Sequence, residues 1–90
     1  MEFEWDSKKA IANERKHGVA FEEASTIFGD PLAFTFLDPD HTDHEQRFIT
    51  FGLSRYNRFL IVSLVERGER IRIISARLMT RKERKIYEEG

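Results

Sequence analysis

The chain has 90 residues, of which 40% are hydrophobic, and its formal net charge is −1. This length and composition predict a single small folded domain over residues 1–90 and exclude a disordered chain. Cysteine is absent, which excludes disulfides, and no apolar run approaches the roughly 20 residues that span a bilayer, so we expect a cytoplasmic protein without a membrane partner.

The first half of the chain predicts a strand, two helices and a second strand. A short strand over residues 3–5 precedes a helix that Asp6 or Ser7 can cap and that ends at His17, before Gly18. Apolar residues at helical spacing predict a second short helix over residues 21–28, and alternation predicts a strand over residues 32–36. A polar loop follows over residues 38–44.

The second half predicts three strands and a final helix. The strands cover residues 47–53, 58–65 and 70–78, and the turns between them are short enough for antiparallel hairpins. Residues 59–65 are apolar on both faces, which is typical of a central strand. Thr80 and Glu83 match a capping box that opens the last helix.

The order of these elements predicts an α+β fold. We expect an antiparallel sheet of four main strands, with a short N-terminal strand, packed against two N-terminal helices and one C-terminal helix. The core is expected to contain Trp5, Phe21, Phe28, Phe34, Phe59, Ile61 and Ile73.

The last strand carries arginines at positions where a buried strand is otherwise apolar. In a regular strand Arg70 and Arg72 share one face, whereas Arg72 and Arg77, five residues apart, point to opposite faces. A strand that presents guanidinium groups on one face indicates a phosphate-binding surface.

Charge is distributed unevenly along the chain. Residues 21–46 contain seven acids and no Lys or Arg, whereas residues 47–90 contain eleven bases and five acids. The basic half suits an anionic ligand such as nucleic acid, and the acidic segment suits a partner with basic or amphipathic segments. A mixed solvated surface explains the same charges equally well.

Several blocks of the sequence resemble the BrnT-type toxins. The most specific are Asn13-x-x-Lys16-His17-Gly18-Val19 and Arg72-Ile73-Ile74-Ser75-Ala76-Arg77. The block Thr80-x-x-Glu83-Arg84-x-x-Tyr87 is similar too. The resemblance implies a RelE-like fold and the toxin of a type II toxin–antitoxin pair. It further implies a metal-independent, cofactor-free endoribonuclease that cleaves RNA and blocks translation. A BrnA-type antitoxin would neutralise it and would provide its only contact with operator DNA.

Metal-free RNA cleavage needs a base, an acid and cations for the charge that develops on phosphorus. Histidine exchanges protons near neutral pH, and Lys16 supplies a charge beside His17. Glu45 is either the catalytic carboxylate or the group that orients Arg47. The catalytic candidates are therefore Lys16, His17, Glu45, Arg47, Arg72 and Arg77, and the RNA-binding candidates are Arg58, Arg70 and Tyr87.

Each candidate also has a purely structural interpretation. Lys16 and His17 suit the C-terminal end of a helix dipole, and Arg77 can bond to Glu83 of the last helix. Tyr87 can belong to the core, and some of the arginines can pair with surface carboxylates.

Two further alternatives concern metal ions and catalysis. Residues 38–45 hold six possible metal ligands, but they lack the central glycine and the ligand spacing of calcium and zinc sites, so no metal is expected. The alternative function is a non-catalytic nucleic-acid-binding or interaction module.

Overall fold

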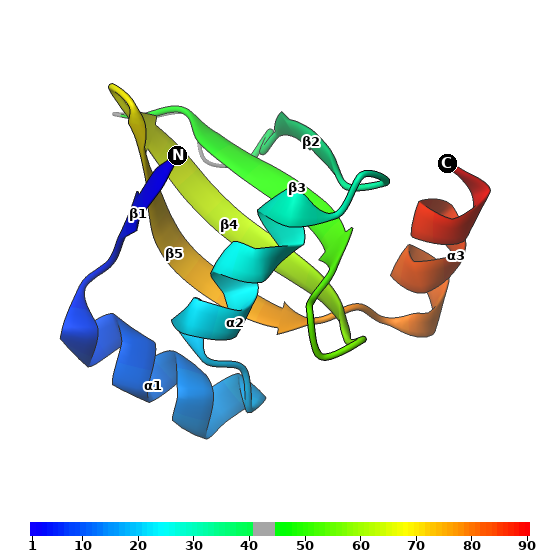
Figure 1. The fold of residues 1–90 in the computed structure, drawn as a ribbon, viewed down its shortest axis with the longest axis horizontal. Coiled ribbons are helices and arrows are strands. Elements are labelled where there is room, and N and C mark those ends of the chain that lie inside the picture. The colour runs from blue at the N-terminus through cyan, green and yellow to red at the C-terminus, as the bar shows by residue number, and fades with distance from the viewer. Residues whose placement is uncertain (41–44) are drawn as a thin grey trace.

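The computed structural model describes residues 1–40 and 45–90 and contains a five-stranded sheet with helices on both faces (Figure 1). The elements in chain order are β1 (Glu2–Glu4), α1 (Ser7–His17), α2 (Phe21–Ser25), the 3₁₀ helix η1 (Thr26–Gly29), β2 (Phe34–Leu37), β3 (Arg47–Leu53), β4 (Phe59–Arg67), β5 (Arg70–Leu78) and α3 (Arg81–Glu89). The predicted α+β class is confirmed.

The strand order is β1-β5-β4-β3-β2, which makes β4 the central strand as predicted. Strands β2 to β5 form an antiparallel meander, but β1 pairs with β5 in parallel, so the sheet is mixed rather than antiparallel. The parallel register places Glu2 opposite Arg70 and Glu4 opposite Arg72. Opposite charges on facing positions stabilise this pairing.

Local signals define the ends of the helices. The Asp6 carboxylate accepts hydrogen bonds from the backbone of Lys8 and Lys9, at 2.8 and 3.1 Å, and so caps α1. Gly18 ends α1 with a φ of 70°, which glycine adopts without strain. Thr80 and Glu83 form the predicted capping box of α3.

One core cluster lies between the sheet and the helices α1, α2 and η1. It consists of Val19, Phe21, Ala24, Ile27, Leu60, Val62, Ile73 and Ala76. Gly52 of β3 allows η1 to approach the sheet, because a Cβ atom there would lie 2.8 Å from the Cβ of Ile27.

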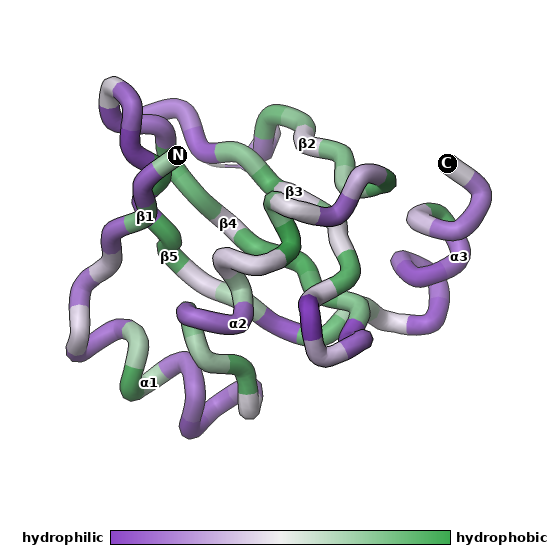
Figure 2. Tube along the Cα trace, viewed as in Figure 1, coloured by the Kyte–Doolittle hydropathy of each residue, from purple (hydrophilic) through white to green (hydrophobic). Residues whose placement is uncertain are grey.

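A second cluster lies on the opposite face, where α3 covers one end of the sheet away from β1 (Figure 1). It joins Phe51 and Ile61 to Tyr87. In Figure 2 the mostly apolar β4 contrasts with the mostly hydrophilic α3. Of the predicted core residues, Phe21, Ile61 and Ile73 are buried, while Trp5, Phe28, Phe34 and Phe59 are partly buried at the margins of the two clusters.

The helices in residues 1–40 and 45–90 are all too short or too polar to cross a membrane.

Candidate functional site

A bulge in β5 decides which of its arginines share a face of the sheet. Ser63 of β4 pairs with Ser75, but the next residue, Leu64, pairs with Ile73. Ile74 is therefore an extra residue in β5. Such a residue disrupts the ladder locally and resets the alternation of side chains along its strand.

The bulge places Arg72 and Arg77 on the same face, so the prediction that they point to opposite faces is wrong. Arg72 lies opposite Val65, and Arg77 lies opposite Ile61. Val65 and Ile61 are four residues apart in β4 and hence share a face. A prediction from alternation assumed unbroken pairing, and it fails where one residue is added.

Arg47 lies on this face as well. It pairs with Val65 from the other side, so Arg47 and Arg72 flank β4 with their Cα atoms roughly 10 Å apart, which is two strand spacings. We call this surface, which carries Arg47, Arg72 and Arg77 and lies opposite α1 and α2, the arginine face. No hydrogen bond or ion pair joins the Arg47 side chain to another residue within 1–40 or 45–90.

Two serines lie between the arginines. They are Ser63 of β4 and Ser75 of β5, which pair with each other. Ser63 also pairs with Ile49 of β3 and is partly buried in an otherwise apolar central strand. The two hydroxyl groups add neutral hydrogen-bonding capacity in the middle of the arginine face. The sequence analysis missed both residues, although a serine inside the run of residues 59–65 was a signal for them.

Arg72 and Arg70 are paired with the carboxylates of β1. The Arg72 guanidinium donates to Oε2 of Glu4 at 3.0 Å, and Arg70 lies 3.6 Å from Glu4 and 3.9 Å from Glu2. The bond from Arg72, helped by Arg70, holds the pKa of Glu4 below its ordinary value although burial opposes the shift. Arg72 is half-buried, whereas Arg70 is more exposed and more loosely held.

Arg77 connects the last strand to the last helix. Its guanidinium donates to both carboxylate oxygens of Glu83, at 2.7 and 2.9 Å, and to the carbonyl of Leu78 at 3.2 Å. The two bonds from Arg77 and the capping bonds with Thr80 lower the pKa of Glu83 to about 2, against the effect of burial. Arg77 thus forms the bond to Glu83 that its structural interpretation predicts. Its position in β5 still places it on the arginine face.

Arg58 lies at the other end of the sheet. It donates to both oxygens of Glu23 and, at 3.0 Å, to the carbonyl of Gly18, and Ser54 donates to the same carboxylate at 2.8 Å. Glu23 is buried, and the bond from Arg58 lowers its pKa despite burial. Arg58 therefore links the α1–α2 turn to the β3–β4 turn. It lies far from Arg47, because Arg47 is at the opposite end of the paired strands β3 and β4.

Lys16 and His17 lie beside the bulge of β5. They line one shallow pocket of about 240 Å³, together with Lys9, Ala12, Asn13, Ile74 and Ser75. The last turn of α1 and the displaced backbone of β5 thus bring a histidine and two lysines to the edge of the arginine face, near Ser75.

Asn13 fixes α1 against this part of β5. Its side-chain amide donates to the carbonyls of Val19 and Ala76, at 2.9 and 2.8 Å, and its oxygen accepts from the backbone of Ala76 at 3.0 Å. The buried amide therefore pairs with β5 as a neighbouring strand would. Sequence analysis did not assign this role, although a polar residue on the inner side of α1 was a signal for it.

Glu45 pairs with Arg67 at 3.0 Å and has no bond to Arg47, contrary to the expectation that it orients Arg47. Arg47 pairs with Val65, so continuing the antiparallel ladder by two residues brings Glu45 opposite Arg67. Both side chains of this ion pair are about half exposed, 48% for Glu45 and 49% for Arg67.

Tyr87 is buried in the second cluster. Its ring meets Phe59 edge to face, and its hydroxyl donates to Oδ2 of Asp30 at 2.5 Å. Burial and this bond raise the pKa of Tyr87 to about 12. The side chain is 8% exposed, so its ring has no free face for a base, and its position fits the core interpretation.

Within residues 1–40 and 45–90, no three His, Asp or Glu side chains gather where they could hold a metal ion. The histidines and Asp43 of the 38–45 segment, which the sequence analysis weighed as metal ligands, lie outside the described residues.

Comparison with known proteins assigns a family to this arrangement. Residues 5–83 match the family model described as the ribonuclease toxin BrnT of a type II toxin–antitoxin system. The crystal structure of the Brucella abortus ribonuclease toxin BrnT matches with a TM-score of 0.69 and 24% identity, covering 90% of this chain and 99% of that chain. No curated protein matches. The chain belongs to the BrnT family of ribonuclease toxins of type II toxin–antitoxin systems.

Proposed function

We propose that this toxin is a metal-independent endoribonuclease of RelE-like type that binds and cleaves RNA on the arginine face. Arg47, Arg72 and Arg77 would contact phosphate, and Lys16 and His17 would act from the edge beside Ser75. In this proposal residues 1–90 form one toxin domain in the cytoplasm, cleavage blocks translation, and a BrnA-type antitoxin neutralises the toxin and makes the contacts with operator DNA.

The observation that supports this site is the shared face of the three arginines. Arg47 is free of partners within the described residues, and Arg72 is half-buried, so both can exchange water or a carboxylate for a phosphate. Cations fixed on strands stabilise charge that develops on phosphorus without reorganising. His17, which lines the adjoining pocket, supplies the proton-transfer group that such cleavage requires.

A second candidate function is RNA binding without cleavage. It is favoured by the carboxylates that already occupy three of the arginines, which are Arg58, Arg72 and Arg77. In a non-catalytic module these pairs would hold the fold, and Arg47, which no described residue pairs with, would remain for the ligand.

The test is incubation of the purified toxin with an unstructured RNA in excess EDTA. Cleavage supports the nuclease, whereas binding with intact RNA supports the module. Arg47→Ala should reduce single-turnover cleavage about 100-fold, which is typical for the loss of one charge-stabilising donor. Arg55→Ala, in the β3–β4 turn at the other end of the sheet, is the matched control and should retain activity. Full activity of Arg47→Ala would remove this residue from the site.

A further inference from the structure

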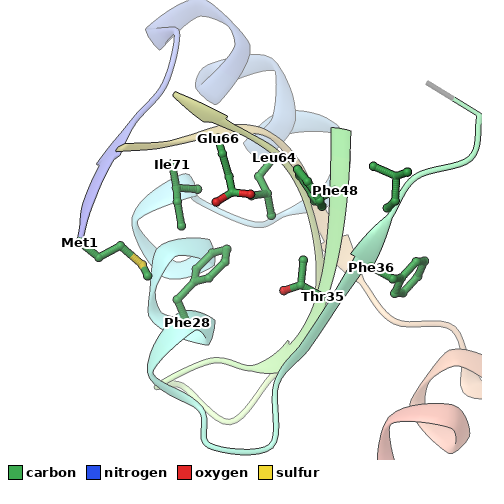
Figure 3. A pocket seen from close by; sticks show the side chains of 9 residues that line it. Met1, Phe28, Thr35, Phe36, Phe48, Leu64, Glu66 and Ile71 are labelled. Atoms are coloured by element: carbon green, nitrogen blue, oxygen red, sulfur yellow. The ribbon is translucent and has the colours of Figure 1, made fainter. Parts of the chain in front are cut away.

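The face of the sheet that α1, α2 and η1 cover is left open at one end. Beyond Phe28 of η1 a groove of about 420 Å³ opens, and Figure 3 shows Phe28, Leu64 and Ile71 pointing into it from three different elements. It is lined by Met1, Phe28, Thr35, Phe36, Leu37, Phe48, Leu64, Glu66 and Ile71. A volume in the range of roughly 300–1,000 Å³ is typical of binding pockets.

The floor of the groove is a row of apolar side chains across neighbouring strands. Leu37 pairs with Phe48, and Phe48 pairs with Leu64, so these three side chains follow one another over β2, β3 and β4. Ile71 continues the floor on β5, which gives a width of three strand spacings, or roughly 14 Å. An α-helix with its side chains is about 10–12 Å across, so one helix fits on this floor beside η1.

Several apolar side chains at the groove remain in contact with water. The exposed fraction is 43% for Leu37 and 82% for Met1. They lie together at one groove, and grouped exposure of this kind marks interaction surfaces, whereas single exposed residues do not.

The charge around the groove specifies the chemistry of its occupant. Among the described residues that line the groove, Glu66 is the one with a charged side chain. None of the described lining residues is basic, and Glu66 forms no ion pair with another described residue. A second copy of the chain docked groove to groove would bring a second Glu66 towards the first, which is unfavourable.

We propose that this groove binds an amphipathic helix of the antitoxin. The apolar side chains of that helix would lie on Leu37, Phe48 and Leu64, and its Lys or Arg residues would face Glu66. Such helix-in-groove binding uses anchors spaced three and four residues apart. The inference rests on the proposed function for its partner, but it names a surface on the opposite side of the sheet from the arginine face.

The first test changes the apolar floor. Leu37→Asp should weaken binding of the antitoxin encoded beside the toxin gene at least about tenfold in calorimetric titration, since it removes an apolar anchor and adds a like charge. The control is Ile11→Asp on α1, an equally drastic change at a side chain that is 55% exposed and does not line the groove. It should bind as the wild type does.

The second test changes the charge of Glu66, which is exposed at the end of β4. Glu66→Lys should also weaken binding, because it opposes the basic face of the helix, and Glu14→Lys on α1 is its control. Thermal melts followed by circular dichroism check that each variant is folded. If Leu37→Asp does not fold, the Glu66→Lys pair alone decides the question.

The outcomes separate this inference from the proposed nuclease. Wild-type binding by both groove variants would overturn it, as would a wild-type toxin that forms no complex with the antitoxin. Loss of self-association in Leu37→Asp, with antitoxin binding intact, would overturn it in favour of a dimer interface. RNA cleavage is measured on the same proteins, and its absence would remove the nuclease while a binding defect in the groove variants still supported the docking site.

Discussion

Arg72 and Arg77 lie on the same face of the sheet although five residues separate them, because the extra residue Ile74 resets the alternation of β5. The two guanidinium groups differ in their attachments: Arg72 is joined to Glu4 of the first strand and Arg77 to Glu83 of the last helix. Their replacement should therefore have different consequences.

Arg72→Ala should abolish most RNA cleavage, with a loss of about 100-fold in single-turnover rate, and should leave the fold intact. Arg55→Ala is the control, since Arg55 is exposed in the β3–β4 turn and lies outside the arginine face. Equal activity of the two variants would show that the half-buried arginine has no special part in cleavage.

His17→Ala should remove a limb of the pH–rate profile near neutrality, because it removes a proton-transfer group. Lys16→Ala, the next residue in the same pocket, should lower RNA affinity without changing the shape of the profile. The measurement is single-turnover cleavage against pH. Identical profiles for both variants would mean that the pocket beside the bulge contributes only charge.

Glu83→Gln should make the folded state less dependent on pH in the acid range. The folded-state pKa of Glu83 is about 2, below its ordinary value of 4.5. The stabilisation is therefore fully present above pH 4.5 and is lost as the pH falls from 4.5 towards 2. Because water screens the partly exposed Arg77, we expect a contribution of about 1–2 kcal/mol. Urea denaturation at several pH values measures it, and an unchanged slope in Glu83→Gln would contradict the assignment.

Asn13→Ala should destabilise the fold by about 1–3 kcal/mol, since it leaves buried backbone groups of β5 without partners. The control is Glu14→Ala, at the next residue of α1, which is exposed. It should change the free energy of unfolding by less than about 0.5 kcal/mol. If urea denaturation gave the same loss of unfolding free energy for both variants, water would be taking over the hydrogen bonds that the Asn13 amide makes to β5.

Phe21→Ala should cost about 3–5 kcal/mol, because the side chain is 0% exposed in the main core cluster. Phe59→Ala should cost less, since Phe59 lies at the margin of the second cluster under Tyr87 and Arg84. Thermal and urea unfolding of the two variants give the comparison. A larger loss of unfolding free energy in Phe59→Ala than in Phe21→Ala would show that the second cluster contributes more to stability than the main one.

The sequence predicted features that depend on neighbouring residues. The Asp6 and Gly18 caps, the Thr80–Glu83 box and the central place of β4 follow from local bonding and composition, and the structure confirms them.

The sequence could not predict features that depend on pairing between distant strands. The parallel docking of β1 on β5 joins opposite ends of the chain, and no local pattern records it. The bulge at Ile74 changes which side chains share a face, while the run of residues 72–77 reads as a regular strand. The partner of Glu45 likewise follows from the register of β3 against β4, which is known only once the strands are paired.

The pairing of Glu4 with Arg72 also has a consequence for how the toxin is made. The two residues are 68 positions apart, and a ribosome adds roughly 5–20 residues per second, so Glu4 is synthesised roughly 3–14 seconds before its partner exists. Glu83, the partner of Arg77, is synthesised later still. The arginine face is therefore incomplete throughout most of translation, and the nascent toxin acquires the whole site only when its last helix has been made.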